Sequence, residues 1–145
     1  MELGLKGRVA IITGPAKGMG AAISKSFAGE GAKVALIGRD VAAIEPVAHE
    51  VTAAGAEAII VPCDLTRPGD CDQAADETIK AFGRIDILVN VAGGSGPVGK
   101  TGAETTPEEF DDIVTLNMNG CFHTMRSVVP AMIAQTFGKI VNVGG

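Results

Sequence analysis

The sequence predicts an α/β fold in one domain over residues 1–145: a doubly wound parallel sheet with strand order 3-2-1-4-5. Short β-branched runs alternate with helical segments along the whole chain. The runs are almost continuously apolar, which is typical of parallel strands that helices cover on both faces. A glycine-rich stretch directly follows the first run, at the position where such folds turn from a strand into a helix.

Composition limits the possible functions. With 46% hydrophobic and 20% charged residues, the 145-residue chain has enough apolar material for one core. A net charge of −5 lacks the basic surface that nucleic acids require, so no nucleic-acid partner is expected. No apolar run approaches the roughly 18 residues of a membrane span, and the N-terminus lacks a signal-peptide core, which predicts a cytoplasmic protein without membrane contact. Cys63, Cys71 and Cys121 have no metal-binding spacing and are expected to be reduced and buried.

Five short runs are expected to form the strands. They are RVAIIT at residues 8–13, KVALIG at 33–38, EAIIVP at 57–62, IDILVN at 85–90 and KIVNVG at 139–144. Helices between them would make right-handed crossovers. The long connection at 93–106 follows the fourth strand, so it is expected at the carboxyl edge of the sheet, where ligands bind in such folds.

The segments between the strands carry helical patterns, at residues 21–30, 41–54, 71–82 and 107–136. The last begins with a strong start signal: Thr106 is the expected N-cap, Pro107 follows, and Glu109 closes a capping box. Pro130 is expected to kink or end the regular part of this helix.

Three glycines lie in the stretch TGPAKGMG at residues 13–20. Gly14 lets the chain turn off the first strand, while Gly18 and Gly20 expose backbone N–H groups at a helix N-terminus. Because the helix dipole favours an anion there, we expect a pyrophosphate to bind. The spacing departs from the commoner Gly-x-Gly-x-x-Gly pattern, and a tight turn without a ligand is the alternative.

The residues after the second strand indicate which dinucleotide binds. Sites for NAD usually place a carboxylate there, where it binds the ribose 2′-OH. In this chain Gly38 takes that position, Arg39 follows, and Lys17 adds a second cation. Two cations without an acid favour a 2′-phosphate, so NADP(H) is expected over NAD(H), with solvated surface charge as the alternative. Asp40 is expected to cap the next helix.

Four motifs occur along the chain in a characteristic order and spacing. They are TGPAKGMG, CDLT at residues 63–66, NVAG at 90–93 and LNMNG at 116–120. In these motifs the whole chain resembles the N-terminal, cofactor-binding portion of the short-chain dehydrogenase/reductase family. The resemblance implies a Rossmann-like domain that is truncated after the fifth strand. Val91 departs from the Asn-Asn-Ala-Gly usual in the family.

The resemblance assigns roles to residues of these motifs. The expected contacts are Gly14, Gly18, Gly20 and the backbone of Met19 with the pyrophosphate, Asp64 and Leu65 with the adenine, and Asn90, Ala92 and Gly93 with the cofactor ribose and the sheet. Members with basic residues at positions 17 and 39 tend towards NADP(H). Full-length members pair through the long helix, which implies a homo-oligomer, a dimer or tetramer. The alternative is that the apolar face of this helix simply covers the sheet.

Asn117 is the candidate catalytic residue. It lies on the apolar side of the last helix, four residues from both Ile113 and Cys121, and a buried carboxamide requires hydrogen-bond partners. One interpretation is a structural amide bonded to neighbouring backbone. The resemblance implies the other, in which Asn117 is one of four catalytic residues and holds a water of a proton relay.

The other catalytic residues that the resemblance implies are missing. The family transfers a hydride between nicotinamide and a carbonyl or alcohol carbon, using a tyrosine, a lysine four residues later and a serine. This chain has no tyrosine, and Gly145 stands three residues after Asn142, where the serine is usual. Asp86, Lys100 and Glu104 are expected at the surface and not as substitutes.

Three hypotheses for the function follow. The first is an NADP(H)-dependent oxidoreductase acting on a small-molecule alcohol or ketone, of which this chain carries the cofactor half and is inactive alone. The second is an NADP(H)-binding module without turnover. The third is an inert truncated product whose fifth strand is an exposed apolar edge.

Overall fold

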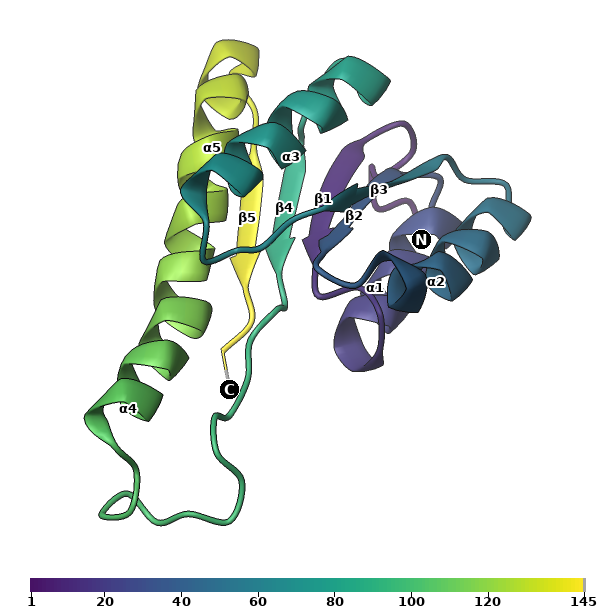
Figure 1. Ribbon diagram of the computed structural model, residues 1–145. Helices are drawn as coiled ribbons and strands as arrows, with labels where there is room; N and C mark the ends of the chain where they lie inside the picture. The colour runs from purple at the N-terminus through teal and green to yellow at the C-terminus, as the bar shows by residue number, and fades with distance from the viewer. Residues whose placement is uncertain (145) are drawn as a thin grey trace.

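The computed structural model describes residues 1–144 and places the five apolar runs side by side in one parallel sheet (Figure 1). The strands are β1 (Val9–Thr13), β2 (Lys33–Gly38), β3 (Ala58–Pro62), β4 (Ile87–Asn90) and β5 (Lys139–Asn142). Their order in space is β3-β2-β1-β4-β5, and each neighbouring pair is parallel. The predicted fold class and strand order are confirmed.

Helices cover both faces of the sheet because side chains alternate along each strand. The helices α1 (Gly18–Gly29) and α2 (Val41–Ala53) pack on one face, and α3 (Pro68–Phe82) and α5 (Gly120–Gln135) pack on the other (Figure 1). Ile11 and Ile12 are both buried, yet they belong to the cores on opposite faces. Two hydrophobic cores therefore form, one on each face of the sheet.

Two helices begin three residues earlier than the sequence predicts. Helix α1 begins at Gly18 and not at residue 21, so the glycines at 18 and 20 belong to its first turn. Helix α3 begins at Pro68 and not at residue 71. Proline suits the first turn because its fixed φ is helical and the N–H it lacks would have no partner there. Gly83 ends α3 in the left-handed conformation, with φ of 80°.

The last helical segment differs most from its prediction. It consists of α4 (Pro107–Val114), a π-helical turn η1 (Thr115–Asn119) and then α5. The predicted capping box is confirmed, since the Glu109 N–H donates to Thr106 Oγ1 at 3.2 Å and the Thr106 N–H donates to Glu109 Oε2 at 2.9 Å. The helix does not end at Pro130 but continues to Gln135.

Burial on either side of Pro130 explains why the helix continues. Val128 and Met132 are both buried against the sheet. Their packing opposes the roughly 3 kcal/mol that a proline costs inside a helix. The sequence pattern shows the proline but not this compensation.

Several apolar side chains remain at the surface. Phe110 of α4, Met118 of η1 and Phe122 of α5 are 59%, 61% and 58% exposed, so they do not cover the sheet. Ile140 and Val141 are also exposed on β5, the strand at one edge of the sheet.

Asp86 is fully buried at the amino edge of the sheet, and the expectation of a surface position is wrong. Its carboxylate accepts hydrogen bonds from the Val9 N–H at 3.0 Å and Arg8 Nη1 at 3.2 Å. Arg84 donates to it from Nε at 2.8 Å and from Nη2 at 2.6 Å. The Asp86 backbone also bonds to Val9 and Lys139, so this residue joins the starts of β1, β4 and β5.

The surroundings of Asp86 keep it ionised. Burial by itself would raise the pKa of Asp86, but hydrogen bonds from Arg84, the Val9 N–H and Arg8 outweigh burial and hold the pKa below its ordinary value of 3.8. A carboxyl group whose pKa is lower in the folded state stabilises the fold fully above its unfolded pKa. That contribution is lost as the pH falls through the folded pKa.

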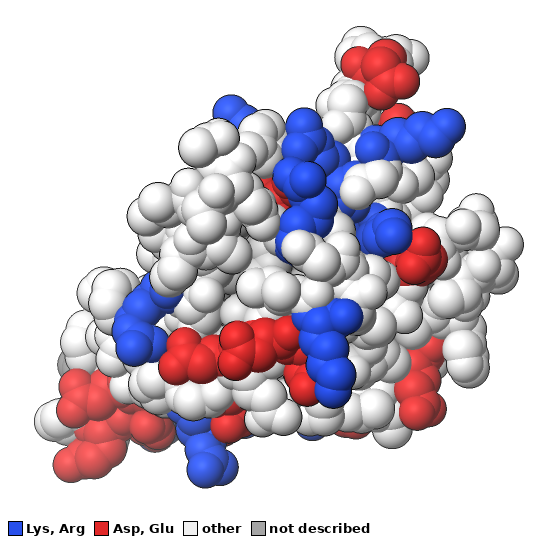
Figure 2. Space-filling view, turned by 90° about the horizontal axis from the view of Figure 1, so that it is seen from above, with Lys and Arg blue, Asp and Glu red and all other residues white. Residues whose placement is uncertain are grey.

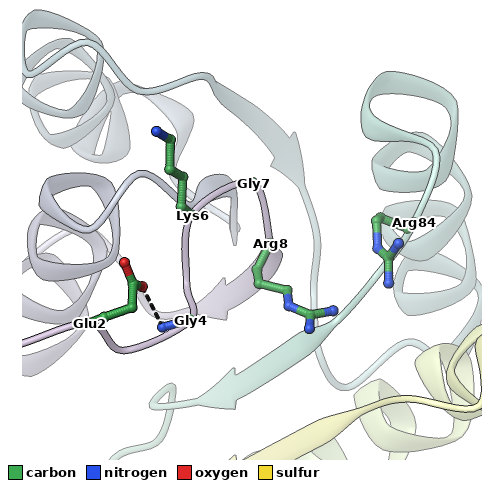
Figure 3. A pocket seen from close by; sticks show the side chains of 6 residues that line it. All are labelled: Glu2, Gly4, Lys6, Gly7, Arg8 and Arg84. Carbon is green, nitrogen blue, oxygen red and sulfur yellow. Dashed lines mark hydrogen bonds between the residues drawn. The ribbon is translucent and has the colours of Figure 1, made fainter.

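Basic side chains gather over this amino edge, as the view onto the starts of the strands shows (Figure 2). Arg8 and Arg84 precede β1 and β4, while Lys33 and Lys139 begin β2 and β5. A shallow hollow of about 450 Å³ lies here, lined by Glu2, Gly4, Lys6, Gly7, Arg8 and Arg84 (Figure 3). The two guanidinium groups in it bind the buried Asp86 carboxylate, which gives them a structural role.

We predict that Asp86→Asn lowers the free energy of unfolding at pH 7 by about 2–3 kcal/mol, because both arginines keep their charge and lose the buried counter-ion. Stability of the unaltered chain should also fall below about pH 4, and more steeply than in the variant. Urea unfolding followed by circular dichroism measures both effects.

Asp72→Asn is the matched control. Asp72 accepts hydrogen bonds from Ser127 and Arg126, but its side chain is 49% exposed and solvent screens its charge. Its substitution should therefore have a much smaller effect. Equal losses in the two variants would contradict the role given to Asp86.

Candidate functional site

A cleft of about 490 Å³ opens at the carboxyl edge of the sheet, opposite the Asp86 edge. It is lined by the loops that follow β1, β2, β3 and β4 and by Leu116 of η1. Nine of the eleven predicted cofactor contacts lie in its wall: Gly14, Lys17, Gly18, Met19, Arg39, Asp64, Leu65, Ala92 and Gly93. Parallel pairing explains this convergence, because it brings the carboxyl ends of strands distant in sequence to one edge.

The first loop requires glycine at particular positions. Gly14 and Gly18 have φ of +62° and +55°, a region that other residues rarely adopt. A Cβ on Gly14 would lie 2.9 Å from Ala92 Cα, so this glycine also lets the β1 and β4 loops approach each other. Gly20 is buried behind the loop, where a Cβ would overlap the Gly14 carbonyl and approach Pro15. Its place in the structure serves packing.

The N-terminus of α1 faces this cleft without a competing cap. Lys17 is the N-cap residue in extended conformation. Within the described residues its side chain makes no capping hydrogen bond, and the first turn of α1 contains no acidic residue. The N–H groups of that turn and the positive end of the helix dipole are therefore available to an anion.

The loop after β2 contains a carboxylate that caps a helix, Asp40, and an exposed cation, Arg39. Asp40 Oδ1 accepts the Ala43 N–H at 3.1 Å, which confirms it as the N-cap of α2. Arg39 and Lys17 are both exposed on the rim of the cleft. Gly38 leaves room for Ile44, whose Cδ1 would lie 3.0 Å from an added Cβ.

Asp64 presents an ionised carboxylate at the end of β3. Its Oδ1 accepts the Thr66 hydroxyl at 2.7 Å and the Thr66 N–H at 2.9 Å. These two hydrogen bonds, helped by the charges of Arg39 and Arg67, lower the pKa of Asp64. Leu65 beside it is buried, and Gly120 packs on it so closely that an added Cβ would lie 3.2 Å from Leu65 Cβ.

Thr13 is a residue that the sequence interpretation missed. It is fully buried at the end of β1, and its Oγ1 accepts the N–H groups of Val91 and Ala92, each at 3.0 Å. This hydroxyl fixes the chain after β4 against β1. A polar β-branched residue closing an apolar run was the signal available in the sequence.

Asn90 is buried beneath the cleft and connects three elements. Its Nδ2 donates to Asn142 Oδ1 of β5 at 2.8 Å, and its Oδ1 accepts the Thr124 hydroxyl of α5 at 2.7 Å. Both ends of the amide are therefore used by the protein. This geometry fits the expected support of the sheet.

Asn117 lies on the π-helical turn η1 and is half-buried. Its Oδ1 accepts the Gly94 N–H at 3.1 Å, and its Nδ2 donates to the carbonyls of Gly94 and Ile113, each at 2.9 Å. It therefore holds the long connection after β4 against the helix, as the structural interpretation expects. A catalytic role for Asn117 stays a prediction.

The remaining candidates fall outside the cleft. Lys100 pairs with Glu109, and Glu104 accepts the Thr101 N–H at 2.8 Å, both at the surface as expected. Gly145, the position expected for a serine, lies outside the described residues.

Within residues 1–144, no cluster of three or more His, Cys, Asp or Glu is arranged to hold a metal ion. The helices of that range are all too short or too polar to span a membrane.

Comparison with known proteins gives matches along nearly the whole chain. A family model described as short chain dehydrogenase matches residues 8–145. The chain is 38% identical over 138 residues to 2-(R)-hydroxypropyl-CoM dehydrogenase of Xanthobacter autotrophicus, covering 94% of this chain and 55% of that one. It is 34% identical over 139 residues to 2,5-dichloro-2,5-cyclohexadiene-1,4-diol dehydrogenase of Sphingobium indicum. The match covers 96% of this chain and 55% of that one. The chain thus spans about half the length of these curated relatives.

Solved structures show the same arrangement of strands and helices. A metagenomic short-chain oxidoreductase in complex with NADP is 38% identical with a TM-score of 0.87, over 94% of this chain and 61% of that one. An NAD⁺-bound xylitol dehydrogenase is 32% identical with a TM-score of 0.85, over 94% of this chain and 52% of that one. Since the family model matches nearly its whole length, the chain belongs to the short-chain dehydrogenase family and has a Rossmann-like fold.

Proposed function

We propose that this chain is the cofactor-binding portion of an NADP(H)-dependent oxidoreductase that acts on a small-molecule alcohol or ketone. The observation that carries the proposal is the uncapped N-terminus of α1, which opens into the carboxyl-edge cleft between the exposed cations Lys17 and Arg39. When bound there, NADP(H) supplies the hydride. The protein supplies the binding contacts and the orientation.

The residues that line the cleft offer contacts for each part of a dinucleotide. Free N–H groups at the start of α1 would hold the pyrophosphate, and the bare backbone at Gly18 lets it approach. The ionised Asp64 and the Leu65 backbone would meet the adenine at one end. Ala92 and Gly93, positioned by Thr13 and Asn117, would line the nicotinamide ribose at the other.

The charges of the rim favour the phosphorylated cofactor. Lys17 and Arg39 together offer two positive charges, and a ribose 2′-phosphate would engage both. Asp40, the nearest carboxylate after β2, already accepts the Ala43 N–H as a helix cap. A free ribose 2′-OH would therefore lack the carboxylate that NAD sites usually supply at the position that Gly38 occupies here.

Turnover by the chain alone is not expected. The described part of the cleft wall contains neither a tyrosine–lysine pair nor a serine that could move a proton to or from a substrate oxygen. For the 145 residues by themselves, nucleotide binding without catalysis is accordingly the second candidate function. The inert-product hypothesis differs from both because it predicts neither binding nor a cooperative melting transition.

We also propose that the protein is a cytoplasmic homo-oligomer, a dimer or tetramer, without a nucleic-acid or membrane partner. Phe110, Met118 and Phe122 are exposed along one helical segment and would be covered by a second copy. The net charge of −5 opposes nucleic-acid binding.

Replacing the rim cations should discriminate between the two cofactors. We predict that Arg39→Ala weakens NADPH binding about tenfold through loss of a charged hydrogen bond, while NADH binding changes little. Lys17→Ala should act in the same direction, and the double variant should lose most of the preference. Fluorescence titration of each cofactor measures the two dissociation constants.

Arg126→Ala is the control for a general loss of positive charge, because Arg126 of α5 pairs with Asp72 of α3 and does not line the cleft. It should leave both affinities unchanged. Tighter NADH than NADPH binding by the unaltered chain would refute the proposed preference.

Adding one methyl group behind the glycine loop should disrupt the cleft. We predict that Gly20→Ala weakens NADPH binding at least tenfold and lowers stability by about 2 kcal/mol, since the Cβ would overlap the Gly14 carbonyl. Titration and urea unfolding provide the measurements. Gly69→Ala, in the first turn of α3, is the matched control and should not reduce either quantity. An unaffected Gly20→Ala variant would contradict the packing role given to Gly20 behind the loop.

A further inference from the structure

Two thiols that cofactor binding does not require lie together beneath the adenine end of the cleft. Cys63 directly follows β3, and Cys71 lies in α3. Both are buried, and their sulfur atoms are 3.9 Å apart, with the Cys63 thiol donating to the Cys71 sulfur. The Cys71 thiol in turn faces the Leu65 carbonyl at 3.9 Å.

This pair is mechanically connected to the cleft wall. Cys63 lines the cleft beside Asp64 and Leu65. The loop between the two cysteines is held by its own hydrogen bonds, including the Asp64 N–H to Asp70 Oδ2 at 3.0 Å. On the other side His123 Nδ1 lies 2.7 Å from the Leu65 carbonyl. A movement of either sulfur would therefore displace Asp64 and Leu65, the residues that would meet the adenine.

We propose that Cys63 and Cys71 form a dithiol site that a peroxide converts to an intramolecular disulfide, and that this conversion weakens nucleotide binding. The contact distance of 3.9 Å must shorten to a bond of about 2.05 Å, which draws the start of α3 towards the end of β3. Cys63 forms part of the cleft wall and Cys71 lies directly behind it, so a peroxide that enters from the cleft must pass Cys63 to reach the Cys71 sulfur. The effect on binding rests on the proposed function, whereas disulfide formation does not.

The chemistry has a defined order. The hydrogen bond from Cys63 lowers the pKa of Cys71 because it stabilises the thiolate, and it raises the pKa of Cys63. The Cys71 thiolate attacks one oxygen of hydrogen peroxide, the O–O bond breaks, and the other oxygen leaves as water after protonation. The Cys63 sulfur then attacks the resulting sulfenic acid, loses its proton, and expels the hydroxyl as water. Two thiols are oxidised, and one peroxide is reduced to two waters.

The test uses the full 145-residue chain and a Cys121→Ser variant, in which only the pair remains. Each is treated with hydrogen peroxide, and its intact mass is measured. Cleavage before aspartates then separates the two cysteines, since Asp64 and Asp70 lie between them in the sequence. We expect the loss of two hydrogens and one linked pair of peptides, both reversed by dithiothreitol. The NADPH dissociation constant should rise about fivefold or more on oxidation.

Cys71→Ser in the Cys121→Ser background is the control. It should form no disulfide and should keep its NADPH affinity after the same treatment. A disulfide between two copies, or thiols oxidised without linkage, would overturn the proposed site. Complete linkage with unchanged affinity would overturn its coupling to binding. Absence of NADPH binding by the reduced chain counts against the proposed function alone, because the mass measurement still decides whether the disulfide forms.

Discussion

The cleft depends on the contact between the ends of β1 and β4. The buried Thr13 hydroxyl accepts two N–H groups of the chain after β4, and Gly14 adds no side chain that would hold the two loops apart. The strands β1 and β4 are separated by more than seventy residues in the sequence, yet their parallel pairing makes this contact a local one. The positions of Ala92 and Gly93 in the cleft wall follow from it.

Charged residues serve different purposes at the two edges of the sheet. At the amino edge, Arg8 and Arg84 neutralise the buried Asp86 and join three strand starts. At the carboxyl edge, Lys17 and Arg39 remain exposed beside a helix N-terminus. The first arrangement stabilises the fold, because a buried carboxylate requires partners. The second can attract a phosphate, because within residues 1–144 neither cation forms an ion pair.

The helical segment after the long connection combines support of the cleft with an exposed apolar surface. The π turn brings Asn117 to the Gly94 backbone, where its amide makes two hydrogen bonds. On the same segment Phe110 and Met118 remain at the surface. The helix thus fixes one wall of the cleft and presents a surface suited to another protein chain.

The sequence by itself determined the order of strands and helices, the helix caps at Asp40 and Thr106, and half of the residues that line the cleft. The elements, the caps and the glycine loop follow from hydrophobic periodicity and turn chemistry, which act over a few neighbouring residues. Asp64, Leu65, Ala92 and Gly93 were expected from the resemblance to the family. The tertiary structure alone decided that Asp86 is buried, that α5 continues through Pro130, and that Cys63 meets Cys71. Each of these depends on contacts between elements distant in the chain, and no local pattern records what a side chain will meet once the sheet has formed.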